Sequence, residues 1–229
     1  SSSSPTGTQG TGLASIRACQ SNSQETLMNL PGITIHKLID QLTQSPFSFA
    51  LYRLPWTDEP ILVLQEEGKT EILGNPTDLN GKRGFVLTPF HQTQTHPAII
   101  IHPDKVAHGW GNISQVLEDF ASARNITSAG TIITEKKITN DEEAKIEYEQ
   151  AFSRFITPLQ NKAFRKLVLS RNYTQELDIT FSPLSAFIRA CNSYPRMMIS
   201  LCHTPLTGTW IGSTPEIILS GHETEWDTV

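Results

Sequence analysis

Four stretches of the chain place hydrophobic residues three or four positions apart, which is the spacing of one face of an α-helix. Two of them have clear start signals. Asn140 is followed three residues later by Glu143, as in a capping box, and Ser182 is followed by Pro183. The predicted apolar faces are Ile35, Leu38, Ile39 and Leu42; Ile113, Val116, Leu117, Phe120 and Ala121; Ala144, Tyr148, Ala151, Phe152, Phe155 and Leu159; and Leu184, Phe187, Ile188 and Cys191.

Apolar runs bounded by Gly, Pro, Asn and Asp predict β-strands between these helices. The segment around Thr204-Pro205-Leu206-Thr207-Gly208 is typical of a turn, so its flanking runs are expected to form a hairpin. The predicted strands are residues 47–54, 61–64, 84–89, 98–102, 164–171, 197–202, 209–212 and 216–220, and a further strand begins at residue 225.

Composition narrows the class of protein. Of the 229 residues, 38% are hydrophobic and 18% are charged, which is typical of a soluble globular protein. The net charge of −5 argues against a nucleic-acid partner, and no apolar run is long enough to span a membrane. Three cysteines without a Cys-x-x-Cys pair fit a reducing compartment, so we expect a cytoplasmic protein.

The composition also changes along the chain. Residues 1–29 begin with a stretch rich in Ser, Thr, Gln and Gly that lacks an apolar core, and we expect a disordered or artificial leader rather than a signal peptide. A boundary near Ala129-Gly130 divides a loop-rich subdomain, residues 30–130, from a more regularly patterned part, residues 131–229.

Two ionisable residues beside apolar runs are the candidates for catalysis. Lys166 opens the run Lys166-Leu-Val-Leu-Ser-Arg171, and Glu216 follows the turn Gly212-Ser-Thr-Pro215. Burial beside such runs can lower the pKa of a lysine and raise that of a carboxylic acid, which suits them to act as base and acid. Residue chemistry alone also allows a lysine that extends into water from a strand end, and an exposed glutamate that opens a strand.

These two motifs, in this order, resemble those of the chorismate-utilising enzymes, the family related to component I of anthranilate synthase. The segment Lys166-Leu-Val-Leu-Ser-Arg171 is similar to the strand that carries the general base in isochorismate and salicylate synthases, where amination-type enzymes usually have Gln. The segment Trp210-Ile-Gly-Ser-Thr-Pro-Glu216 is similar to the one that carries the general acid. The resemblance covers roughly the last ninety residues, from the Asn140 helix onward.

The resemblance implies an α+β fold with antiparallel sheets packed by helices, and the activity of an isochorismate synthase. Lys166 would deprotonate a water that adds to C2 of chorismate, and Glu216 would protonate the departing C4 hydroxyl. It also implies a Mg²⁺ ion that anchors the substrate, with its acidic ligands C-terminal to Val229. Residues 131–229 would then be the first, incomplete part of the chorismate-binding domain, and a C-terminal remainder of the same enzyme would complete the site.

Three interpretations stay open at this point. The first is isochorismate synthase, serving menaquinone or siderophore synthesis. The second is a salicylate synthase or an amination-type enzyme, although Lys166 argues against amination. The third is a fragment that is inactive by itself. The seven histidines lack the spacing of a metal motif, and we interpret them as loop residues.

Overall fold

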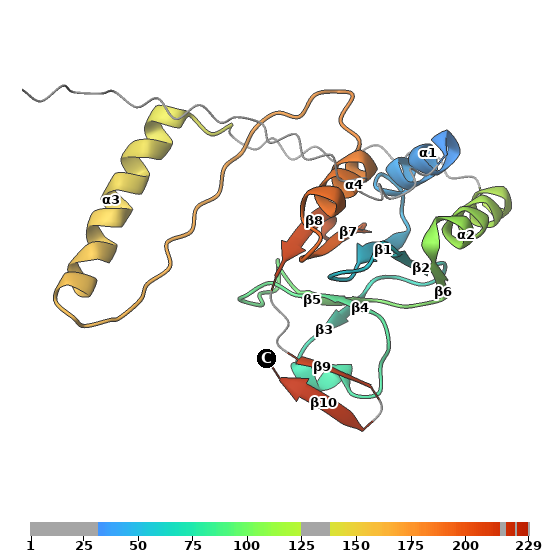
Figure 1. The fold of residues 1–229 in the computed structure, drawn as a ribbon, viewed down its shortest axis with the longest axis horizontal. Coiled ribbons are helices and arrows are strands. Elements are labelled where there is room, and N and C mark those ends of the chain that lie inside the picture. The colour runs from blue at the N-terminus through green and yellow to red at the C-terminus, as the bar shows by residue number, and fades with distance from the viewer. Residues whose placement is uncertain (1–31, 125–137, 216–218, 223, 229) are drawn as a thin grey trace, which may run out of the picture.

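The computed structural model describes residues 32–124, 138–215, 219–222 and 224–228 (Figure 1). The predicted leader, residues 1–29, lies outside these ranges, as do Ala129 and Gly130 of the predicted boundary. The fold is α+β with antiparallel sheets, as expected. Its helices are α1 (Ile33–Leu42), α2 (Gly109–Ala123), α3 (Asp141–Gln160) and α4 (Pro183–Ser193), with a short 3₁₀ helix η1 (Pro76–Leu79).

The largest sheet has the strand order β6-β2-β1-β7-β8, and every neighbouring pair is antiparallel. A second sheet has the order β3-β5-β4, and the last two strands form a separate hairpin. The strands are β1 (Ser48–Arg53), β2 (Pro60–Gln65), β3 (Glu71–Leu73), β4 (Phe85–Leu87), β5 (Ala98–Ile101), β6 (Lys105–His108), β7 (Met198–Thr204), β8 (Gly208–Thr214), β9 (Leu219–His222) and β10 (Glu225–Thr228).

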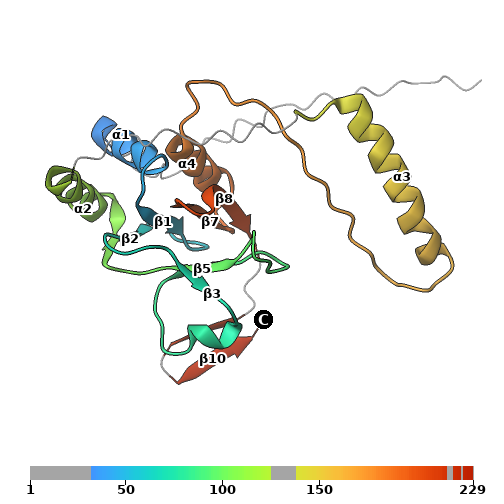
Figure 2. The same ribbon diagram turned by 180° about the vertical axis from the view of Figure 1, so that it is seen from behind.

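The large sheet is the middle one of three layers (Figures 1 and 2), and we call these three layers the layered body. Helices α1, α2 and α4 cover one face, where Phe49 and Leu51 of β1 join Phe187 of α4 in the main core. The small sheet covers the other face, where Ala50 and Cys202 meet Ile101. Strand β1 is therefore buried on both faces, because alternate residues point to different layers.

Strands from both sides of residue 130 build this sheet, since β7 pairs with β1 along Phe49–Arg53. The predicted division into residues 30–130 and 131–229 stays a prediction, but the hydrogen bonds of the sheet join the two parts. Helix α4 also packs beside α1 (Figure 1), and the backbone N–H of Leu184 donates to Asp40 Oδ1 at 3.0 Å.

A buried arginine links β1 to the end of α4. Arg53 is 1% exposed, and its guanidinium donates to the carbonyl oxygens of Pro195 at 2.7 Å, Tyr194 at 2.8 Å and Cys191 at 3.2 Å. Carbonyls at a helix C-terminus carry partial negative charge and lack partners within the helix, so a cation is favoured there. Arg53 therefore holds the C-terminal end of α4 against the sheet.

Helix α3 and the segment that follows it differ from this body. We call residues 138–182 the α3 arm, and Figures 1 and 2 show α3 standing apart from the sheets. The predicted cap is present, because Asn140 Oδ1 accepts from the backbone N–H groups of Glu142 at 2.9 Å and Glu143 at 3.4 Å. Even so, α3 buries none of its twenty residues.

The prediction of a strand at residues 164–171 is wrong. The segment is irregular and pairs with no described strand. A strand needs a ladder partner to satisfy its backbone, and this segment runs beside α3 rather than along a sheet edge. Sequence reasoning also missed β3 and β6, which are short strands without a clear apolar run.

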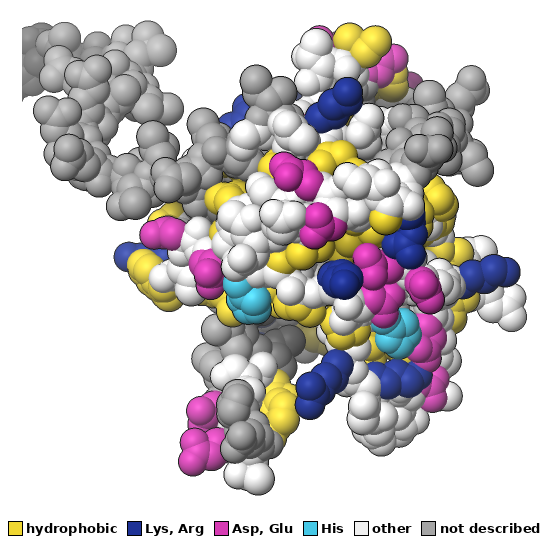
Figure 3. All heavy atoms as spheres, turned by 90° about the vertical axis from the view of Figure 1, so that its right-hand side faces the viewer, with side chains coloured by type: hydrophobic (Ala, Val, Ile, Leu, Met, Phe, Trp, Pro, Cys, Tyr) yellow, Lys and Arg dark blue, Asp and Glu magenta, His cyan; other side chains and the backbone are white. Residues whose placement is uncertain are grey.

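Two further observations concern the surface. On the face that carries α2, acidic and basic side chains lie side by side (Figure 3). One ion pair links the end of α2 to the segment after β2, because Arg124 Nη1 lies 3.7 Å from Glu66 Oε1. Among the helices that the structure describes, none has the length and apolar character needed to cross a membrane.

Candidate functional site

The lysine of the predicted pair lies in the α3 arm and is exposed. Along its segment the exposure alternates as the sequence predicts: Leu167 and Leu169 are half-buried, whereas Val168 is 74% exposed. Lys166 shares the exposed face of Val168. The described residues therefore leave its ammonium in water and do not supply the burial that the sequence led us to expect.

The glutamate of the pair, Glu216, lies outside the described residues. The strand that leads to it is described. β8 forms the edge of the large sheet, and all seven of its residues are exposed. In β8, Gly212 lies opposite Ser200, and a Cβ at Gly212 would approach Ser200 Oγ to 2.9 Å. A side chain at Gly212 would therefore require Ser200 to change its rotamer.

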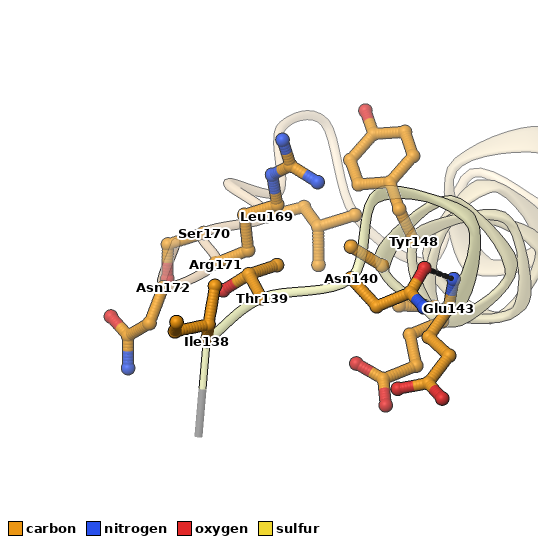
Figure 4. A pocket seen from close by; sticks show the side chains of 12 residues that line it. Ile138, Thr139, Asn140, Glu143, Tyr148, Leu169, Ser170, Arg171 and Asn172 are labelled. Carbon is orange, nitrogen blue, oxygen red and sulfur yellow. Dashed lines mark hydrogen bonds between the residues drawn. The ribbon is translucent and has the colours of Figure 1, made fainter. Parts of the chain in front are cut away.

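A cavity of about 350 Å³ lies between the Lys166 segment and the start of α3 (Figure 4). Leu169 and Tyr148 point toward it from the two elements, and Ser170 and Asn172 point away. Its remaining lining comes from Ile138, Thr139, Asn140, Glu143, Ala144, Glu147, Ala151 and Arg171. The sequence indicated Tyr148 only as part of an apolar helix face.

Hydrogen bonds join the two walls of this cavity at one end. The N–H of Thr139 donates to the carbonyl of Thr174 at 2.7 Å, and the N–H of Thr174 donates to Thr139 Oγ1 at 2.6 Å. Tyr173 Oη donates to Asp141 Oδ1 at 3.0 Å, and this hydrogen bond raises the pKa of Tyr173. Local sequence patterns do not predict these hydrogen bonds, because the partners are more than thirty residues apart in the chain.

The charges around this cavity do not suit a dianionic substrate. Two carboxylate side chains, Glu143 and Glu147, line it together with one guanidinium, that of Arg171. Arg171 also lies over the ring of Tyr173, 5.7 Å from its centroid. A dianion would meet more negative than positive charge here. The cavity is thus not by itself a chorismate site.

Within residues 32–124, 138–215, 219–222 and 224–228, no three His, Cys, Asp or Glu side chains gather closely enough to hold a metal ion. The expected Mg²⁺ ligands C-terminal to Val229 stay a prediction.

Comparison of the chain with protein-family models, with curated proteins and with solved structures found no match. The resemblance to the chorismate-utilising enzymes thus rests on the two motifs alone, and the fold is established as far as α+β with antiparallel sheets.

Proposed function

We propose that the chain belongs to an isochorismate synthase, in which Lys166 is the general base and Glu216 the general acid. The observation that carries the proposal is the pair of motifs, Lys166-Leu-Val-Leu-Ser-Arg171 followed by Trp210-Ile-Gly-Ser-Thr-Pro-Glu216, in the order of the family it resembles. The substrate would be chorismate, and Mg²⁺ would be its cofactor.

Two features of the described residues are compatible with these roles. Lys166 is exposed, so water can reach its amine. β8 pairs with β7 in the large sheet and ends at Thr214, so the segment that leads toward Glu216 begins at a strand of this sheet.

Incubation of the purified protein with chorismate and Mg²⁺, followed by chromatography of the products, tests the proposal. We expect isochorismate when the wild type is combined with the C-terminal remainder that would supply the Mg²⁺ ligands, and a loss of about 10²–10⁴-fold in rate for Lys166→Ala and for Glu216→Gln, the range of acid–base catalysis. Lys145→Ala is the matched control, because Lys145 is an exposed lysine of α3. Its rate should equal that of the wild type.

The products separate the remaining alternatives. Salicylate with pyruvate would replace the proposal with a salicylate synthase. Turnover only after the C-terminal remainder is added would support the third interpretation, a fragment that is inactive by itself. Absence of turnover even then, or an undiminished rate in Lys166→Ala, would contradict the proposal.

A further inference from the structure

A second cavity, of about 440 Å³, lies against the β7–β8 hairpin. Three segments meet there: Leu87–Pro89 at the end of β4, Thr95–Pro97 before β5, and the hairpin residues Leu206, Thr207 and Trp210. Its volume lies within the range of small-molecule sites, about 300–1,000 Å³.

A tryptophan held in one orientation forms part of the wall. The indole Nε1–H of Trp210 donates to the carbonyl of Thr207 at 2.7 Å, which satisfies the polar group of the ring. The side chain is nevertheless 56% exposed. An indole fixed in this way offers an apolar ring surface on which a planar molecule can stack with little loss of side-chain entropy.

A histidine on another wall is also held in place. The N–H of Thr93 donates to the carbonyl of His96, and the N–H of His96 donates to Thr93 Oγ1, each at 3.0 Å. Its ring Nδ1 lies 3.0 Å from Thr95 Oγ1 and 3.4 Å from Thr93 Oγ1. Among the described residues no group bonds to Nε2 of His96, so this nitrogen is available to a ligand.

Among the described residues that line this cavity there is no Asp, Glu, Lys or Arg. A charged ligand would leave water without gaining an ion pair, whereas a neutral one loses little. Leucine and proline side chains supply the other apolar surface, and the hydroxyls of Thr88 and Thr207 add polar groups. This combination favours a flat, uncharged molecule with one or two hydrogen-bonding groups.

We propose that this cavity binds a neutral planar aromatic alcohol, which stacks on Trp210 and exchanges a hydrogen bond with His96. The site is independent of the proposed function, because chorismate carries two carboxylates and these walls carry no positive charge. Phe90, 96% exposed in the same β4–β5 loop, adds an aromatic side chain close in sequence to the site.

Titration with 2-naphthol, followed by calorimetry and by the NMR signals of the indole N–H groups, tests this inference. We expect saturable one-to-one binding that shifts the indole signal of Trp210. Trp210→Leu should weaken the affinity about tenfold, as expected for loss of one aromatic stacking partner. Trp56→Leu is the matched control, since Trp56 is 70% exposed but lies in the loop after β1, and its affinity should be that of the wild type.

Two further measurements define the chemistry. The anion 2-naphthoate should bind more weakly than 2-naphthol, and His96→Ala should lower the affinity for 2-naphthol severalfold. Thermal unfolding of each variant verifies that it folds. Non-saturable binding, equal affinity in wild type and Trp210→Leu, or tighter binding of the anion would each overturn the proposal.

Discussion

The layered body and the α3 arm have similar helical sequence patterns but opposite burial. The stripe of α4 is buried at Leu184, Phe187, Ile188 and Cys191. The stripe of α3, which begins with a side-chain cap and an acidic first turn, stays at the surface, with Tyr148 45% and Phe152 47% exposed. An amphipathic pattern therefore shows that a helix has an apolar face, whereas burial depends on whether another element is placed against it.

The largest expected effect comes from truncating one phenylalanine in each region. Phe187 is fully buried in α4, and Phe187→Ala should lower the free energy of unfolding by about 3–5 kcal/mol, because it leaves a cavity in the core. Phe152→Ala on α3 should change it by less than about 0.5 kcal/mol, as for surface positions. Urea unfolding measures both. Equal losses would show that α3 is packed in solution.

Two arginines, one in the layered body and one in the α3 arm, test whether polar side chains differ between these regions as the phenylalanines do. Arg53→Met removes the donor to three carbonyls at the end of α4 and should cost roughly 2–4 kcal/mol, because those buried acceptors lose their charged partner. Arg171→Met, in the exposed arm, should leave the unfolding midpoint where it is. If Arg53→Met were as stable as the wild type, the link between β1 and α4 would contribute nothing.

The pH dependence of stability gives a smaller effect, confined to the layered body. Burial lowers the pKa of His203 below its ordinary value of 6.5, against the opposing effect of its hydrogen bond to Ser45. Nε2 lies 3.0 Å from the carbonyl of Ser45 and must carry the proton, so Nδ1, 2.9 Å from Thr209 Oγ1, accepts in the neutral ring.

The unfolded chain therefore binds this proton more readily than the folded one. The contribution of His203 is fully present above pH 6.5 and is lost as the pH falls from there through the lowered pKa, by at most about 1.4 kcal/mol per pH unit. His203→Gln can still donate to Ser45 but cannot titrate, so its stability should vary less between pH 7.5 and 5. Identical pH profiles would contradict the buried neutral histidine.

Much of the layered body could be predicted from local patterns. The helix at Ile35–Leu42 and the strands around Phe49 and Leu62 appear where the apolar spacing places them, and Ser182 caps α4 through Ser185 N–H at 3.1 Å. The order of the large sheet could not be predicted, because β1 pairs with β7 across about 150 residues. The candidate site was predicted only as two motifs; Glu216 lies outside the described residues, and the walls around Trp210 come from three separate segments.

Helix ends, turns and the alternation of exposed and half-buried residues at Lys166–Ser170 follow from the amino-acid sequence by itself, because they depend on neighbours within a few positions. Tertiary structure alone decided that this alternation belongs to an unpaired segment and that β1 is buried on both faces. It also decided that a guanidinium is buried at the end of α4. The physical reason is the same in each case: a strand's hydrogen bonds and a side chain's burial depend on groups far away in the chain, whereas a helix satisfies its own backbone.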